Sequence, residues 1–191
     1  METVKISWLL LAMSLVAIPA AAQSIGSGTV VYGGSPDDGW AFTVSVPAGW
    51  NFDCCNRAKD FDANLLVFPA GWDGQNLDHV MVLMVWPTER ADVDSDWQAD
   101  ADDYFAQYPG LTSITYQAQV KDAACLSSTY FGADSVSDYV AFCDPGADWN
   151  YRFAWSMSVR GDRVDTAAED AFRETVRDTM PLHMRIQASP R

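Results

Sequence analysis

Histidine is nearly absent from this chain, and its scarcity limits the chemistry available. Only His79 and His183 occur among the 191 residues, and the spacing patterns typical of zinc sites, serine hydrolases and phosphate-binding loops are missing. A histidine-based triad or zinc site therefore has almost no material, although the many aspartates could supply a carboxylate pair of the glycosidase type. Because nothing singles out two of those aspartates, we predict a protein that is not an enzyme and carries no cofactor.

Basic residues and glutamate are also scarce. Lysine and arginine number 12 against 26 acidic residues, of which only four are glutamates, so the net charge at pH 7 is −14. A surface with this charge repels nucleic acid and anionic lipid, which excludes both as partners. It leaves cations, basic proteins or neutral glycans as candidates. The alternative is that the charge serves solvation alone.

Long apolar runs are missing except at the start of the chain. There, residues 6–18 form an apolar stretch after Lys5 and are followed by Pro19 and three alanines. The stretch is too short to span a bilayer comfortably, and small residues before a cleavage point are typical of secretory signals. We predict that residues 1–22 are a signal peptide cut after Ala22. The mature protein would then be periplasmic or secreted, with no membrane insertion.

Cysteine is sparse but informative in an exported protein. The four cysteines are Cys54, Cys55, Cys125 and Cys143. In an oxidising compartment we expect two disulfides. Counting outward from a hairpin turn centred on Asp134 brings Cys125 opposite Cys143, at disulfide distance. The adjacent Cys54 and Cys55 would then pair with each other, a strained and reducible bond that would suit a redox or metal role. The alternative is that each of these two bridges to a different strand.

Strand patterns dominate the rest of the sequence. We predict strands over residues 29–32, 40–46, 65–68, 80–86, 114–120, 124–131, 139–143 and 151–159. The turns between the later strands are short, which indicates antiparallel neighbours. We therefore expect one antiparallel sheet in a single domain over residues 23–181. A loose tail over residues 182–191 should follow it.

Two helices interrupt the strands, and each starts with a predicted capping box. The first box begins at Ser95 and the second at Thr166. The expected buried faces are Trp97, Ala101, Tyr104, Phe105 and Tyr108 in the first helix, and Ala168, Phe172, Val176 and Met180 in the second. Each helix should bury its face against the sheet, which gives an α+β fold.

The order of these elements resembles the PsbP-like family. The carriers are the strand and turn of residues 40–50, which end in Pro-Ala-Gly-Trp, the mid-chain helix, the run of long strands and the C-terminal helix with Phe172. That family includes the photosystem II extrinsic protein and many small exported bacterial proteins. The resemblance implies an antiparallel sheet with helices packed on it as an α/β/α sandwich. It also implies a non-enzymatic binding or assembly domain whose partner is another envelope protein.

One acidic cluster has the beginning of a calcium-loop pattern. Asp92, Asp94 and Asp96 alternate as such ligands do. The glycine required at the sixth position is replaced by Trp97, and the predicted capping box assigns the same residues to a helix start. We therefore predict a solvated helix terminus and no metal site. These three aspartates remain a weak calcium candidate.

Three tryptophans form the other candidate site. Trp50 and Trp72 each end a Pro-Ala-Gly-Trp turn that follows a predicted strand. Together with Trp149 they could make a stacking platform for sugar rings or an apolar patch for a partner protein. The alternative is that they fold back into the core. A further functional alternative is an acidic inhibitor or immunity protein that blocks a basic envelope enzyme.

Overall fold

The computed structural model describes residues 18–25, 28–34, 39–120, 123–132, 135–161 and 165–182. The strands are β1 (Ile18–Ile25), β2 (Gly28–Gly34), β3 (Trp40–Ser45), β4 (Trp50–Asp53), β5 (Leu65–Pro69), β6 (Met81–Pro87), β7 (Thr112–Val120), β8 (Ala123–Phe131), β9 (Val136–Asp144), β10 (Tyr151–Arg160) and β11 (Met180–Pro181). The helices are α1 (Arg57–Asp60), α2 (Val93–Gln107) and α3 (Thr166–Asp178). None of the helices in these ranges is long and apolar enough to cross a membrane.

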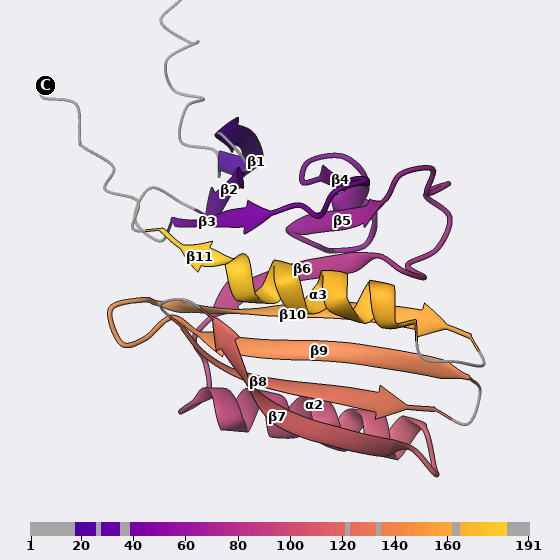
Figure 1. The fold of residues 1–191 in the computed structure, drawn as a ribbon. Helices are drawn as coiled ribbons and strands as arrows, with labels where there is room; N and C mark the ends of the chain where they lie inside the picture. Colours follow the sequence, from indigo (N-terminus) through magenta and orange to yellow (C-terminus); the bar gives the residue numbers. More distant parts are fainter. Residues whose placement is uncertain are drawn as a thin grey trace, which may run out of the picture.

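The strands form two antiparallel sheets (Figure 1). Four strands pair in the order β1-β2-β3-β11, and seven pair in the order β4-β5-β6-β10-β9-β8-β7. The expectation of one sheet is therefore wrong. The break falls at the turn after β3, where Trp50 donates its backbone N–H to Pro47 and Gly49 takes a φ of +80°. This tight turn redirects the chain from β3 into β4, in the second sheet.

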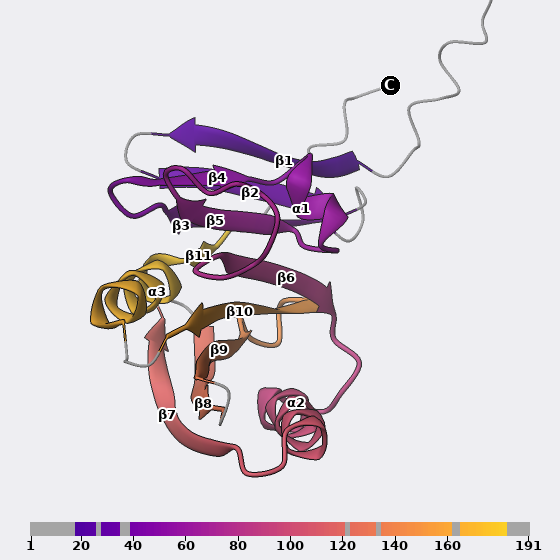
Figure 2. The same ribbon diagram turned by 90° about the vertical axis from the view of Figure 1, so that its right-hand side faces the viewer.

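The seven-stranded sheet carries a long helix on each face (Figure 2). Along β9, Tyr139 faces α3, with its ring 5.9 Å from that of Phe172, whereas the adjacent Val140 packs with Ala101 of α2. Successive residues of a strand point to opposite faces, so the two helices lie on opposite sides. Helix α3 also contacts β3 and so lies against both sheets. The predicted α+β class, antiparallel sheets with helices packed on them, is confirmed.

Most predicted strands are present, and the missed elements are short or lie at the start of the chain. The eight predicted strands correspond to β2, β3 and β5 to β10. Strands β4 and β11 and helix α1 have four, two and four residues, too few for a periodic pattern. Strand β1 pairs with β2 and includes the predicted cleavage point after Ala22. The remainder of the predicted signal, residues 1–17, lies outside the described residues, as do residues 183–191 of the predicted tail.

Both long helices begin at an aspartate rather than at the predicted capping box. Asp92 caps α2, and one of its carboxylate oxygens accepts the Ser95 N–H at 2.8 Å and the Ser95 hydroxyl at 2.6 Å. Asp165 caps α3 and accepts the backbone N–H groups of Ala167 and Ala168, both at 3.1 Å. Aspartate is as good an N-cap as serine and better than threonine. The cap of α2 is therefore Asp92, three residues before Ser95, and the cap of α3 is Asp165, directly before Thr166.

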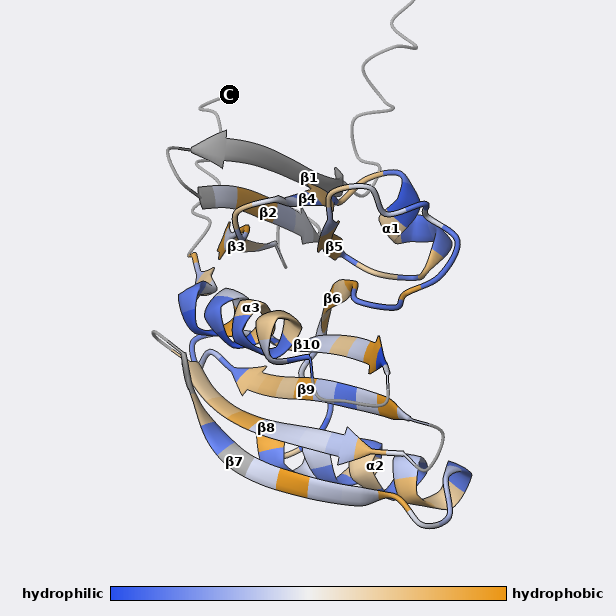
Figure 3. Cartoon of the chain, turned by 45° about the vertical axis from the view of Figure 1, so that its right-hand side comes forward, coloured by the Kyte–Doolittle hydropathy of each residue, from blue (hydrophilic) through white to orange (hydrophobic). Residues whose placement is uncertain are grey.

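The buried face of α3 agrees with the sequence, but that of α2 is narrower than predicted. Ala168, Phe172 and Val176 are buried, and Met180 is half-buried in β11. Both long helices show polar and apolar residues side by side in Figure 3. On α2, Ala101 is buried and Trp97 and Tyr104 are half-buried. Phe105 and Tyr108 are 45% and 50% exposed, which contradicts their assignment to the buried face.

This difference between the helices predicts unequal costs for removing their phenylalanines. Phe172→Ala should lower the free energy of unfolding by about 3–5 kcal/mol, because it empties a closed core position. Phe105→Ala should cost less than about 2 kcal/mol, because nearly half of that side chain is already in water. Urea denaturation of the two variants measures both values. Equal losses would show that α2 packs more deeply than described.

Candidate functional site

The three aspartates of the weak calcium candidate have separate structural roles. Asp92 caps α2, and hydrogen bonds from Ser95 lower its pKa. Asp94 is exposed, whereas Asp96 is buried and paired with arginines. Their carboxylates therefore do not converge on one point. Within the described ranges, no three His, Cys, Asp or Glu side chains are placed to hold a metal ion.

Asp96 belongs to a buried ion cluster centred on Arg152. The Arg152 side chain is 3% exposed, and its Nη1 donates to Asp96 Oδ2 at 2.7 Å while its Nε donates to Asp144 Oδ2 at 2.9 Å. The same Nη1 also reaches the backbone carbonyls of Arg90 and Asp92, at 3.2 and 3.0 Å. The Arg90 side chain donates to Asp96 Oδ1 at 3.1 Å. This cluster joins the first turn of α2 to β9 and β10.

A hollow of about 600 Å³ opens beside this cluster. The residues that line it include Trp149, Asp144 and Arg152, with the neighbouring Thr88 and Asn150. Trp149 is half-buried, and its ring meets the Tyr151 ring edge to face at 5.1 Å and 73°. An aromatic surface therefore lies near an oriented carboxylate. We call this feature the Trp149 hollow.

Trp50 and Trp72 do not share a platform with each other. Their two turns are adjacent, because the Ala70 N–H donates to Gly49 O at 2.9 Å. Trp50 nevertheless packs on the main core, which includes Val67 of β5, whereas Trp72 packs on the other face of that strand. The Trp72 indole N–H donates to a backbone carbonyl at 2.7 Å, and its ring is fixed against its neighbours. The candidate platform of three tryptophans therefore has no common face for Trp50 and Trp72.

The cysteines lie in the two predicted pairs. The sulfurs of Cys125 and Cys143 are at bonding distance, 2.06 Å, and those of Cys54 and Cys55 are 2.07 Å apart. The predicted register of β8 on β9, with Cys125 opposite Cys143, is confirmed. Cys54 and Cys55 lie in the turn before α1, where Asp53 Oδ1 accepts the backbone N–H of Cys55 at 3.2 Å. The Cys125–Cys143 bond therefore crosslinks β8 to β9, whereas the Cys54–Cys55 bond joins two neighbouring residues of one turn.

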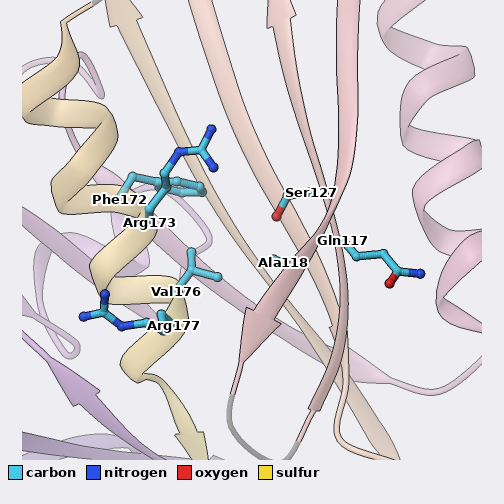
Figure 4. Close-up of a pocket in the computed structure, with 7 residues that line it drawn as sticks. All are labelled: Gln117, Ala118, Ser127, Phe172, Arg173, Val176 and Arg177. Atoms are coloured by element: carbon cyan, nitrogen blue, oxygen red, sulfur yellow. The ribbon is translucent and has the colours of Figure 1, made fainter.

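A second cleft, of about 220 Å³, lies between α3 and strands β7 and β8. In Figure 4, Phe172 and Val176 of α3 face the strands that carry Ala118 and Ser127, while Gln117 points away to the other face. Two arginines of α3 stand at the rim and form ion pairs along the helix, Arg173 with Glu169 and Arg177 with Asp178. The floor is apolar apart from the Ser127 hydroxyl. No sequence motif indicated this cleft, because strand order decides which strand lies beside α3.

His79, the histidine within the described residues, supports the start of α3. Its Nδ1 lies 3.1 Å from Asp78, and its Nε2 lies 3.3 Å from Asp165, the N-cap of that helix. The hydrogen bond to Ala168 and, next, the contact with His79 lower the pKa of Asp165. Both ring nitrogens therefore contact carboxylates that hold the chain in place. His183 lies outside the described residues.

Asp100 is a strongly perturbed carboxylate that the sequence did not indicate. It lies on the sheet side of α2, and its Oδ2 is buried without a hydrogen bond. Burial, with the nearby charges of Asp103 and Asp138, raises its pKa to about 6. The rings of Tyr104 and Tyr130 stack at 4.6 Å in the same region, and burial raises the pKa of Tyr130 to about 12. Above pH 6, the contact between α2 and the sheet therefore contains the ionised Asp100 carboxylate, whose burial lowers the free energy of unfolding.

The ion cluster predicts a large difference between two aspartates of one helix turn. Asp96→Ala should lower the free energy of unfolding by about 3–5 kcal/mol, because it leaves Arg152 buried without its main partner. Asp94→Ala is the matched control and should cost less than about 1 kcal/mol, the scale of a helix-dipole contribution. Chemical denaturation of both variants makes the comparison. A small loss in Asp96→Ala would mean that Arg152 is stabilised by other contacts.

The buried carboxylate predicts an unusual dependence of stability on pH. The folded-state pKa of Asp100, about 6, lies above its ordinary value of 3.8, so the folded protein binds the proton more tightly. Stability from this group is therefore present at low pH and is lost as the pH rises through 6. Asp100→Asn should be more stable than the parent at pH 7 and equal to it near pH 4. Thermal melts across this range, with Asp102→Asn as the charge control, test the difference.

Comparison with known proteins yields a limited structural likeness. No family model matches the sequence, and no curated protein matches it. Among solved structures, the solution structure of cyanobacterial PsbP (CyanoP) from Synechocystis sp. PCC 6803 is similar, with a TM-score of 0.47 and 11% sequence identity. The match covers 84% of this chain and 96% of that one. Membership of the PsbP-like family therefore stays a prediction from the sequence.

Proposed function

We propose that this chain is a non-enzymatic exported binding domain that captures an extended segment of another envelope protein on strand β7. The carrying observation is that β7 is a long, uncharged edge strand. Within the described residues it pairs with β8 alone, so its outer edge offers backbone N–H and C=O groups to a partner. Its nine residues include no charged residue, proline or glycine. Such an edge is a template for strand addition.

The opposite edge of the same sheet, strand β4, differs from β7 in length and in charge. Strand β4 has only four residues and ends in Asp53, whose carboxylate accepts hydrogen bonds from the backbone of the following turn. Short length and charge are the usual protections of an exposed edge. A chain with 26 acidic residues has placed none of them on β7. The lack of protection at β7 therefore supports a pairing surface.

The surroundings of β7 suit a segment with apolar side chains. Ile114 is 61% exposed on this strand and offers an apolar contact to a partner. Further along β7, Ala118 borders the cleft whose far wall is Phe172 and Val176. A strand added to β7 would direct alternate side chains toward this face of the sheet. One row of its side chains would then contact Ile114 and the cleft.

Charge identifies the kind of partner. A second copy of this chain would also carry −14, so self-association is opposed by electrostatic repulsion. A basic protein is attracted by the same field. The paired cysteines support an oxidising compartment, in agreement with the predicted signal peptide. An acidic inhibitor of a basic envelope enzyme would use the same attraction, and the identity of the partner distinguishes that alternative.

Site-specific photo-crosslinking tests this proposal. A benzophenone side chain placed at Ile114 should crosslink one basic envelope protein, whereas the same probe at Met84 should not. Met84 is a suitable control because it is 46% exposed but lies on the interior strand β6. Ile114→Lys should abolish the crosslink at an adjacent position, because a charged edge excludes an added strand. Its stability should change by less than about 0.5 kcal/mol.

Hydrogen exchange on the purified pair then tests the binding mode. Strand addition should slow exchange of the β7 amides, while the amides of β4 stay unchanged. Equal crosslinking from both probe positions would contradict the proposal, and so would unprotected β7 amides in the complex. A crosslinked homodimer would also overturn it, because the occupant would be a second copy.

A further inference from the structure

We infer that the Trp149 hollow is a binding site for a neutral sugar ring. The hollow lies beside the start of α2, and none of the residues that line it lines the α3 cleft. This inference does not rest on the proposed partner site at β7. It rests on three residues that surround one cavity: Trp149, whose ring is packed in place, Asp144, whose carboxylate is oriented, and the buried Arg152.

The indole of Trp149 is fixed in place by its neighbours. Its backbone N–H donates to Gly146 O at 3.1 Å, which closes the turn after β9. Tyr151 supports the ring edge to face, and Trp149, which is half-buried, is one of the residues that line the hollow. The apolar C–H face of a pyranose packs on such a ring. A pre-oriented aromatic side chain loses little conformational freedom on binding.

The carboxylate of Asp144 is oriented as a hydrogen-bond acceptor. Its Oδ2 accepts from Arg152 Nε at 2.9 Å, and its Oδ1 accepts from the Gly146 N–H at 2.7 Å. Each oxygen keeps a further lone pair, and the side chain is 27% exposed. Asp144 can therefore accept hydrogen bonds from hydroxyl groups of a ligand. Asn150 borders the same hollow and adds an amide that can both donate and accept.

Size and charge select the class of ligand. A hollow of about 600 Å³ lies within the range of small-molecule sites. The carboxylates of Asp92 and Asp144 in the lining and of Asp96 in the ion cluster outnumber Arg90 and Arg152 by one, so an anionic ligand is repelled. The Arg152 contact also weakens the attraction of Asp144 for a cation. A neutral molecule with one apolar face and many hydroxyls fits best.

Titration with defined neutral oligosaccharides tests this inference. Maltotetraose, cellotetraose and tri-N-acetylchitotriose are added to the full mature chain, and saturation-transfer NMR reports contact. At least one should bind, and Trp149→Ala should weaken that binding about tenfold, the equivalent of 1.4 kcal/mol. The exposed Asn150→Ala should weaken it several-fold without affecting folding. Trp72→Phe, which alters a tryptophan on the other face of β5, is the matched control and should bind as the parent does.

Each outcome of this titration either supports or overturns the sugar site. Binding by none of the three sugars, or binding that survives Trp149→Ala in a variant with a parental circular dichroism spectrum, would overturn the inference. Tighter binding of choline than of any sugar would also overturn it, in favour of a cation site. Crosslinking from position 114 is a separate measurement. A negative sugar result therefore leaves the proposal for β7 unaffected, and the reverse also holds.

Discussion

The buried pair of Arg152 and Asp96 is the interaction on which the surrounding architecture depends. An isolated arginine in the interior of a sheet would carry a large desolvation cost, which partners must offset. The structure provides them from three directions: a carboxylate from α2, Asp144 at the end of β9, and two backbone carbonyls from the loop before the helix. The same contacts fix where α2 begins. They also orient Asp144, so the shape of the Trp149 hollow follows from this pair.

The second constraint is the division of the strands into two sheets. Helix α3 contacts β3 of the smaller sheet and β7, β9 and β10 of the larger one, and its apolar stripe is shared between them. The strand order places β7 at the edge of the larger sheet, and the cleft lies between this strand and the helix. The open edge is thus a consequence of topology. The lack of charge on β7 is a separate property of its sequence, and the two together favour a pairing surface.

Local patterns in the sequence predicted the features that depend on near neighbours. Counting outward from the short turn predicted the register of β8 on β9, including Cys125 opposite Cys143, because facing residues of a hairpin are equally far from its centre. The stripe of α3 followed from helical spacing. The caps at Asp92 and Asp165 were missed because each competes with a serine or threonine close by. The partners of Arg152 could not be found, because Asp96 lies 56 residues away and only the strand order brings them together.

The difference between local patterns and long-range contacts also explains where the tryptophans lie. Two identical Pro-Ala-Gly-Trp turns suggested a shared platform, and the turns are indeed adjacent. Trp50 is the first residue of β4, but Trp72 lies beyond the end of β5, so each indole follows a different path relative to the sheet. Trp149 has no such repeated motif, yet the ion cluster orients a carboxylate beside it. A tryptophan thus becomes a binding candidate through the polar groups that tertiary contacts bring to it, which local sequence does not reveal.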